Sequence, residues 1–154
     1  MTALRIYQQA LDTVSAAVMA GDFAAYLDMI DLPYLIRMVD ADIILSSAAE
    51  LEPSFRTLSR GLASNGVTHY ERVAREARFQ RSDRIVGRHF THMIARGDRI
   101  QPPHAAAAAL VRRDANAWRF TEASYPLDAA GWPLAEAQVF GPALARASVQ
   151  GLRT

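Results

Sequence analysis

The chain has 154 residues and a formal net charge of +1, with 51% hydrophobic and 21% charged residues. This length fits one domain with its own core, and this composition argues against disorder. The near-neutral charge argues against a protein whose main task is to neutralise a nucleic-acid backbone. The sequence has no cysteine and no lysine. It therefore excludes disulfides, thiol nucleophiles, thiolate metal sites, Schiff bases and a phosphate-loop lysine.

The first segment predicts an amphipathic helix that packs on the core. Its apolar residues follow three- and four-residue spacing, which places them on one helix face; they are Leu4, Tyr7, Leu11, Val14 and Val18. Polar residues interrupt the segment, so it lacks the continuous apolar region of a signal peptide. Nothing in the chain reaches the ~18 consecutive apolar residues of a membrane span. A soluble, cytoplasmic protein without a membrane partner is expected.

A second, short helix is expected directly after the first. Gly21 ends the first helix and Asp22 is placed to cap the next one. The apolar pattern extends this second helix to Ile30, and Pro33 is expected to close it.

A strand pair and a third helix follow. The two β-rich runs around Asp40–Asp42 predict a hairpin. Ser47 and Glu50 have the spacing of a capping box, and Asn65–Gly66 is a stop signal. The apolar face of this helix is Leu51, Phe55, Leu58 and Leu62.

The remaining chain favours strands. Glu71–Arg78 is rich in helix formers, but the pattern from Ile85 onward is typical of strands, with a turn at Gly97–Asp98. His104 is expected in an exposed loop, before two strands that meet at Asp114–Asn116. A further short helix is expected at 134–140. Helices first and strands later, without regular alternation, predict an α+β fold with an antiparallel sheet.

Three segments resemble one family in their order and local pattern. They are AGDFAAYLDMI after the first helix, SSAAELEPSFRTLSRGLASNGV as the capped helix, and LVRRDANAWRFTEASY as a closing hairpin with a tryptophan after its turn. Together they resemble the nuclear transport factor 2-like superfamily, which includes SnoaL-like polyketide cyclases and ketosteroid isomerases. The resemblance covers about residues 4–126.

The resemblance implies a cystatin-like cone, in which a strongly curved antiparallel sheet wraps around three helices from the N-terminal half. It also implies an interior pocket and a homodimer. On this ground Val67–Phe79 is expected to be a strand despite its helix propensity. The whole chain, 1–154, is expected to form a single domain, with a core at about 4–126 and a C-terminal extension at 127–154.

His89 and His92 lie three residues apart within RHFTHM. Because side chains alternate along a strand, the two histidines are expected on opposite faces and cannot bind one metal ion together. We expect His89 to face the interior. His69 lies in the neighbouring predicted strand and could approach His89, but no metal-site spacing supports a shared ion.

Glu122 is the most suggestive acidic residue. It stands two positions from Phe120 and four from Trp118, so it is expected on the same strand face, desolvated, with a raised pKa and able to shuttle protons. The structural alternative is a cross-strand ion pair with an arginine such as Arg112. Further candidates for chemistry like that of ketosteroid isomerases are Tyr7, Tyr26, Tyr34, Asp28 and Asp40.

An arginine recurs at every third position from Arg72 to Arg84. On a helix these side chains would form a basic stripe, but on a strand they alternate faces, and Glu71, Glu76 and Asp83 offset their charge. A solvated sheet surface with salt bridges is the favoured interpretation. No nucleic-acid partner is expected.

The resulting hypothesis is a small-molecule-binding cone-fold protein, with or without acid–base catalysis of the isomerase, dehydratase or cyclase type, on an apolar or aromatic compound. His89 and Glu122 would be its catalytic residues, and the pocket would be lined by Tyr26, Phe55, Trp118 and Phe120. No metal and no cofactor is expected. The alternative is a non-catalytic dimeric protein-interaction module with a filled cone and an exposed apolar sheet face.

Overall fold

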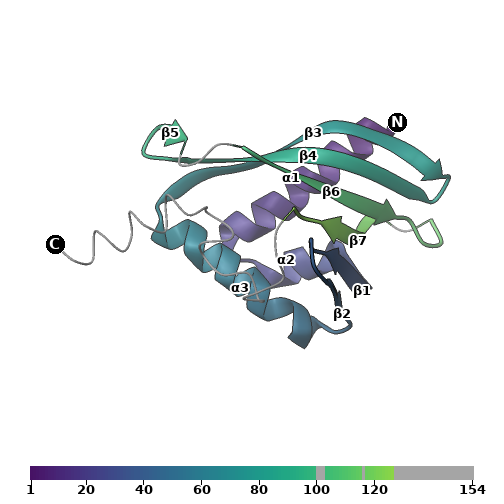
Figure 1. The fold of residues 1–154 in the computed structure, drawn as a ribbon, viewed down its shortest axis with the longest axis horizontal. Coiled ribbons are helices and arrows are strands. Elements are labelled where there is room, and N and C mark those ends of the chain that lie inside the picture. Colours follow the sequence, from purple (N-terminus) through teal and green to yellow (C-terminus); the bar gives the residue numbers. More distant parts are fainter. Residues whose placement is uncertain (100–102, 116, 127–154) are drawn as a thin grey trace.

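A computed structural model describes residues 1–99, 103–115 and 117–126. In chain order its elements are α1 (Ala3–Ala20), α2 (Phe23–Asp28), β1 (Ile30–Arg37), β2 (Asp42–Leu45), α3 (Ala48–Ser64), β3 (Val67–Arg81), β4 (Arg84–Ala95), β5 (Asp98–Arg99), β6 (His104–Val111) and β7 (Arg119–Ser124). Figure 1 shows their arrangement. The predicted helix at 134–140 and the C-terminal extension lie outside the described residues.

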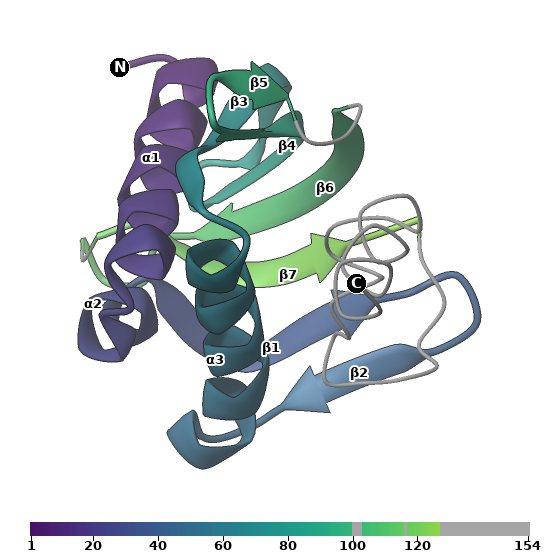
Figure 2. The ribbon, with the colours of Figure 1, turned by 90° about the vertical axis from the view of Figure 1, so that its left-hand side faces the viewer.

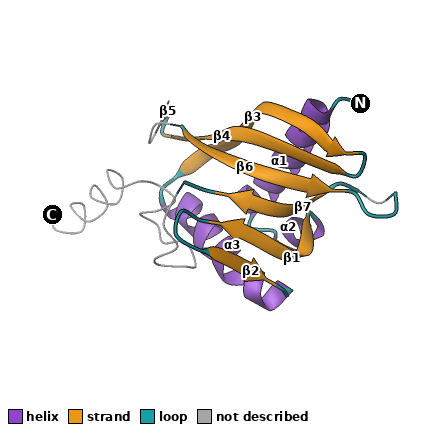
Figure 3. Cartoon of the chain, turned by 45° about the vertical axis from the view of Figure 1, so that its right-hand side comes forward, coloured by secondary structure: helices purple, strands orange, loops and turns teal. Residues whose placement is uncertain are grey.

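The seven strands form one sheet in the order β2-β1-β7-β6-β4-β3, with β5 paired to β4. All pairs are antiparallel except β1 with β7, which is parallel. The three helices lie together on one face of the curved sheet (Figures 2 and 3). The predicted α+β class is confirmed, and this helix-covered face is called the interior face below.

The first two helices begin and end at local signals. Thr2 caps α1, and Gly21 ends it with a φ of 67° in the left-handed region. Asp22 then caps α2 by accepting a hydrogen bond from the backbone N–H of Ala25. The prediction that Pro33 closes α2 is wrong: the helix ends at Asp28, and Pro33 lies inside β1 after a cis peptide bond.

The third helix begins at the predicted cap residue, Ser47, and Glu50 accepts from the residue before the cap instead of from the cap itself. The Ser47 hydroxyl accepts from the Glu50 N–H, and the Glu50 carboxylate accepts from the Ser46 N–H. The face carrying Leu51, Phe55 and Leu62 is buried against the rest of the core. The ends of this helix are therefore set by nearby residues and its orientation by burial of one face.

The two longest strands, β3 and β4, form a hairpin that packs on α1. The expectation of a strand at Val67–Phe79 is confirmed, so pairing with β4 outweighs the helix propensity of this segment. From Ile85 to Ala95 every second residue of β4 is buried, and these residues face the helices. The alternation defines which side chains can reach the interior.

The alanine-rich segment is strand β6, between β4 and β7. His104 begins this strand and pairs with Thr91, so the prediction of an exposed loop there is wrong. Ala106 and Ala108 are buried, and Ala108 belongs to the same hydrophobic cluster as Tyr7 of α1. Within the described ranges, no helix combines the length and apolar character needed to cross a membrane.

Candidate functional site

Tyrosine side chains gather around one arginine on the interior face. Arg72, on β3, interacts electrostatically or by a hydrogen bond with every tyrosine of the chain; they are Tyr7, Tyr26, Tyr34, Tyr70 and Tyr125. They come from α1, α2, β1, β3 and the residue directly after β7. The fold thus collects residues up to 118 positions apart in the sequence around a single guanidinium group.

A small cavity of about 40 Å³ adjoins Arg72. Its polar lining is Arg72, Tyr26, Tyr34, Tyr125 and Ser54. Its apolar lining is Val18, Ile36, Leu51, Phe55 and Leu58. We call these ten residues the Arg72 cavity. Because α1, α2, α3, β1 and β3 all contribute, the cavity exists only in the folded chain.

The guanidinium of Arg72 is held by Tyr70. One terminal nitrogen of Arg72 donates a hydrogen bond to the Tyr70 hydroxyl, and the guanidinium carbon lies 4.9 Å from the centre of the Tyr70 ring. Tyr70 itself is buried. Among the described residues, no Asp or Glu lines the cavity or forms an ion pair with Arg72. Among the described residues, the charge of Arg72 is therefore met by hydroxyl dipoles and by the ring face of Tyr70.

Burial fixes the protonation states in the cavity. It raises the pKa of Tyr26, Tyr34 and Tyr125 above the usual value for a phenol, so these hydroxyls stay protonated at neutral pH. Burial alone would lower the pKa of Arg72, but the tyrosine oxygens raise it above its ordinary value. The cavity thus presents a permanent cation and neutral hydroxyl donors.

A second polar pair lies on the interior face, between α1 and β4. The Tyr7 hydroxyl is 2.7 Å from Nδ1 of His89, and both side chains are buried. Gly87 lies against the Tyr7 ring, so the absence of a side chain there makes room for the tyrosine. The expectation that His89 faces inward is confirmed, as is the separation of His89 and His92 onto opposite faces.

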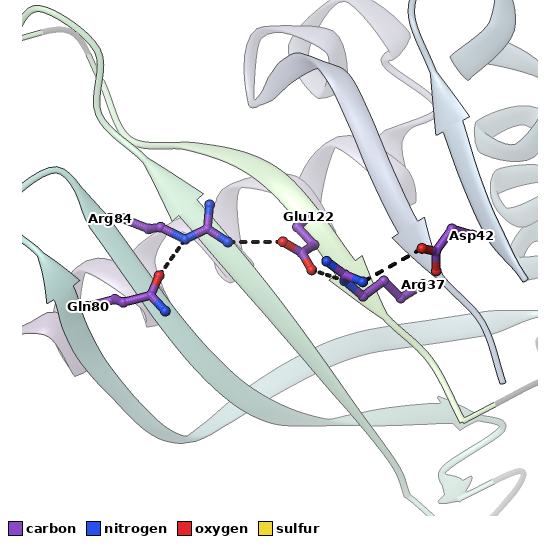
Figure 4. Close-up of polar contacts among 5 residues, drawn as sticks. All are labelled: Arg37, Asp42, Gln80, Arg84 and Glu122. Carbon is purple, nitrogen blue, oxygen red and sulfur yellow. Dashed lines mark hydrogen bonds and ion pairs between the residues drawn. The ribbon is translucent and has the colours of Figure 1, made fainter.

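Glu122 lies on the opposite face of the sheet from the helices. Its carboxylate accepts hydrogen bonds from Arg37 and from Arg84, the latter at 2.9 Å, and Arg84 is held in turn by Gln80 at 2.7 Å (Figure 4). Burial alone would raise the pKa of Glu122, but these two guanidinium groups lower it below the usual value. The prediction of a raised pKa is wrong, and the cross-strand ion pair is observed with arginines other than Arg112.

A β-bulge explains this placement. Ala109 pairs with Glu122 while its neighbour Leu110 pairs with Phe120, so Thr121 is an extra residue in β7. The extra residue reverses the alternation, which leaves Phe120 buried in the core and Glu122 on the outer face. The prediction that Glu122 and Phe120 share a face is therefore wrong.

The four residues expected to line one pocket are separated. Tyr26 and Phe55 line the Arg72 cavity, with ring centres 4.8 Å apart. Trp118 packs on Phe79 and borders a different, shallow hollow near the N-terminus of α1. Phe120 is buried in the core and is not among the described residues that line the Arg72 cavity.

The arginine run is only partly a solvated surface. Arg75, Arg78 and Arg81 are exposed as expected, and Arg84 pairs with Glu122 on the outer face. Arg72, by contrast, points to the interior. Because side chains alternate along a strand, some of these arginines are expected to face inward. Tyr70 lies two positions before Arg72 and therefore on the same face, so a tyrosine there indicates that Arg72 faces the interior. Tyr70 and Tyr125 were not among the sequence candidates.

A hollow of about 520 Å³ lies on the outer face of the sheet. Small residues of β6 and Val86 lie along it, between the charged pairs of Arg84 with Glu122 and of Arg88 with Glu76. Its volume is in the range of small-molecule sites. Four of the charged residues that line it form these two ion pairs, and Arg78 is a further charged residue of its lining.

The remaining titratable candidates do not converge. His69 is exposed and hydrogen-bonded to Thr68 on the outer face, so it does not approach His89. Asp28 and Asp40 are exposed and do not line the Arg72 cavity. Over the part of the chain that the structure describes, no group of three His, Asp or Glu side chains is placed to hold a metal ion.

Solved structures with the same architecture come from several bacteria. A nuclear transport factor 2-like protein of unknown function from Shewanella oneidensis superposes with a TM-score of 0.59 and 12% identity, covering 78% of this chain and 95% of the other. A cystatin-like domain of unknown function from Nostoc punctiforme gives 0.59 and 13%, covering 95% and 91%.

A nuclear transport factor 2-like protein with a cystatin-like fold from Novosphingobium aromaticivorans gives a TM-score of 0.57 and 15% identity, covering 84% of each chain. No protein-family model matches the chain, and no curated protein sequence matches it. At these identities the likeness shows the fold alone.

Proposed function

From this nuclear transport factor 2-like cone fold, we propose that the chain is a small-molecule-binding protein whose ligand enters the Arg72 cavity. The observation that carries the proposal is the convergence of a guanidinium group and tyrosine hydroxyls on one cavity with an apolar wall. A few polar groups that converge in a largely apolar hollow are typical of ligand sites.

The size of the cavity limits the ligand. About 40 Å³ exceeds the ~10–15 Å³ that one water molecule needs, but falls well below the ~300 Å³ of sites for drug-sized compounds. We therefore propose that the cavity takes a compound of a few non-hydrogen atoms, or the polar end of a larger one. Of the apolar or aromatic compounds that the sequence predicts as ligands, we therefore expect those that carry a small polar group to bind.

Filling the cavity tests this proposal. Ser54 lines it from α3, whereas Thr57, one turn away, does not. We expect compounds from a library of small polar fragments to bind the natural chain in saturation-transfer NMR. Ser54→Trp should abolish this binding, and the matched control Thr57→Trp should retain it. Fragments that bind Ser54→Trp equally well would place the site elsewhere.

A second candidate function is acid–base catalysis, favoured by the buried Tyr7–His89 pair at 2.7 Å. A histidine oriented by a phenol can transfer protons if a substrate reaches its imidazole ring. Neither residue belongs to the described lining of the Arg72 cavity, but His89 is among the residues that line a separate hollow of about 230 Å³ beside Arg88 and Phe90. Glu122 has no part in this candidate because its carboxylate is on the outer face.

The test of this candidate is deuterium exchange at the α-carbon of small ketones in D2O. We expect His89→Asn to remove any acceleration that the natural chain gives, while His92→Asn on the outer face leaves it unchanged. If the natural chain gives no acceleration over buffer with any ketone of the panel, the candidate is wrong.

A third candidate, the homodimeric interaction module, rests on exposed apolar side chains of the outer face. Ile44 on β2 and Val73 on β3 are 63% and 43% exposed. Exposed apolar groups on a sheet face favour contact with another protein surface. We expect light scattering to give the mass of a dimer and Val73→Glu to shift it toward the monomer. A natural chain that is monomeric at all concentrations would contradict this candidate.

A further inference from the structure

Arg72 places a positive charge on the interior face of the sheet, beside a cavity. A guanidinium group withdrawn from water is costly to the fold unless a counter-charge or a full set of hydrogen bonds compensates it. Arg72 has the Tyr70 hydroxyl and ring, but no carboxylate among the described residues. A basic side chain that is buried in a folded domain is usually paired with an acidic one. A buried cation that faces a cavity without such a partner among the described residues therefore indicates a ligand that carries the negative charge.

We propose that the Arg72 cavity is a carboxylate site, which binds the acid group of a small aliphatic or aromatic carboxylic acid. This inference rests on the proposed function, because it names the ligand class of the same cavity. In this site the guanidinium of Arg72 donates hydrogen bonds to the carboxylate of the ligand. Hydroxyl groups that line the cavity donate the remaining hydrogen bonds to that carboxylate.

The donor set matches a carboxylate. Arginine presents five N–H groups in a planar fork that fits two carboxylate oxygens, and only one donor of Arg72 is used by Tyr70. Tyr26, Tyr34 and Tyr125 supply neutral hydroxyls on the same cavity. A planar anion can thus accept hydrogen bonds from the guanidinium group and from a tyrosine hydroxyl at the same time.

The cavity also discriminates against a phosphate. A phosphate monoester carries about −1.5 to −2 charges at neutral pH and three free oxygens, which call for more than one cation. Arg72 is the one basic residue in the described lining of this cavity, and the volume is about 40 Å³. A monoanion with two oxygens fits both the charge and the space.

The apolar part of the cavity lining suits the carbon part of such an acid. Val18, Leu51 and Phe55 belong to this lining and are themselves buried. An apolar carbon group that is removed from water there is stabilised by the hydrophobic effect. We therefore infer an acid with an apolar carbon chain or ring next to its carboxylate, rather than a hydroxylated or multiply charged one.

The experiment compares propionate with propionamide, its neutral isostere, by NMR titration of the full chain. We expect propionate to shift the side-chain resonance of Arg72 and the backbone amides of Ser54 and Tyr125. Its Kd should be at least about tenfold lower than that of propionamide. Arg72→Gln should raise the Kd of propionate to the amide's level, whereas Arg75→Gln, on an exposed position of the same strand, should leave it unchanged.

The pH dependence gives a second readout. Arg72 and the buried tyrosines keep their protonation states from about pH 6 to 9, so the Kd of propionate should be constant in this range. It should rise as the pH falls through the ordinary range of carboxylic acids, about 4 to 5, where the ligand becomes neutral. If Arg72→Gln does not fold, as judged by circular dichroism, Arg72→Lys replaces it and should weaken binding severalfold through loss of the planar fork.

The results of this experiment distinguish failure of the carboxylate inference from failure of the proposed function. Equal affinity for propionate and propionamide at the Arg72 cavity would overturn the carboxylate inference and leave the proposed function standing. Retained propionate binding in Arg72→Gln, or equal loss in Arg75→Gln, would also overturn it. Failure of propionate, benzoate and every fragment to shift any resonance of the cavity would overturn both proposals.

Discussion

At the scale of single residues, the contact between Tyr7 and Gly87 joins α1 to the sheet. The Tyr7 side chain is fully buried, and its hydroxyl reaches Nδ1 of His89, two residues beyond Gly87 on β4. A Cβ atom at position 87 would lie 2.7 Å from the Cζ atom of the Tyr7 ring. The glycine is therefore needed for this close approach and not for an unusual backbone conformation.

Gly87→Ala is expected to lower the free energy of unfolding by about 1–3 kcal/mol, because the rigid, buried ring cannot move without disturbing the core. Urea denaturation measures the change. The double variant Tyr7→Leu with Gly87→Ala should lose less than the sum of the two single changes, since the smaller side chain leaves room for the methyl group. An additive result would show that the two positions do not interact.

The residues next to Arg72 in the sequence give little sign that its side chain faces the interior. Its neighbours in the sequence are charged or exposed residues such as Glu71 and Arg75, so the local composition resembles a solvated surface. The phenol groups that surround it come from other elements. Only the alternation with Tyr70 could have indicated an inward position.

At the scale of elements, β3 is an edge strand that α1 protects. The Gln8 amide nitrogen donates to the backbone oxygen of Arg72, and the Gln8 amide oxygen accepts from the backbone N–H of Ala74, both at 2.8 Å. One side chain thus pairs with two backbone groups of a strand edge. Such pairing restrains a strand whose own residues favour a helix and covers groups that could pair with another chain.

Gln8→Ala should lower the free energy of unfolding by about 1–3 kcal/mol, because two hydrogen bonds are lost together. Hydrogen exchange at the Ala74 amide should accelerate, while amides in the middle of β4 stay protected. Gln9→Ala, the next residue on the same helix, is the matched control and should have little effect. Unchanged exchange at Ala74 in Gln8→Ala would contradict this role.

The elements themselves were largely predictable. Capping residues such as Asp22 and Ser47 determine where helices begin, because they satisfy backbone N–H groups within three residues. The end of α2 and the start of β1 were misplaced at Pro33, since the parallel pairing of β1 with β7 involves residues about 90 positions away. The pairing of β1 with β7 therefore determines where α2 ends and β1 begins.

At the scale of the whole molecule, ion pairs tie distant segments across the sheet. Asp31 on β1 accepts two hydrogen bonds from Arg113, after β6, at 2.9 and 3.0 Å. Glu122 on β7 joins Arg37 of β1 to Arg84 of β4. The hydrogen bonds of Arg113 lower the pKa of Asp31, and those of Arg37 and Arg84 outweigh burial and lower the pKa of Glu122.

These shifts predict acid sensitivity. A carboxyl group whose pKa is lower in the folded state stabilises the fold above its unfolded pKa, about 3.9 for Asp and 4.3 for Glu. That stability is lost as the pH falls through the lower folded value. We therefore expect thermal stability to decrease below about pH 5, and Asp31→Asn and Glu122→Gln to show a smaller decrease than the natural chain.

The measurement is a series of melting curves from pH 7 to pH 2.5. Each variant should be less stable than the natural chain at pH 7 and approach it at low pH. Glu52→Gln, at an exposed pair on α3, is the control and should follow the natural curve. Parallel curves for all four proteins would show that neither carboxyl group contributes to the acid sensitivity.

The sequence by itself determined the helix caps, the strand at Val67–Phe79 once the family resemblance was considered, and the separation of His89 from His92. These features follow from interactions or alternation over a few residues. The tertiary structure alone decided which face of each strand meets the helices. It placed Arg72 among five tyrosines and, through the bulge at Thr121, moved Glu122 to the outer face. A single extra residue reverses the side-chain direction of everything after it, and no local pattern marks where that residue falls.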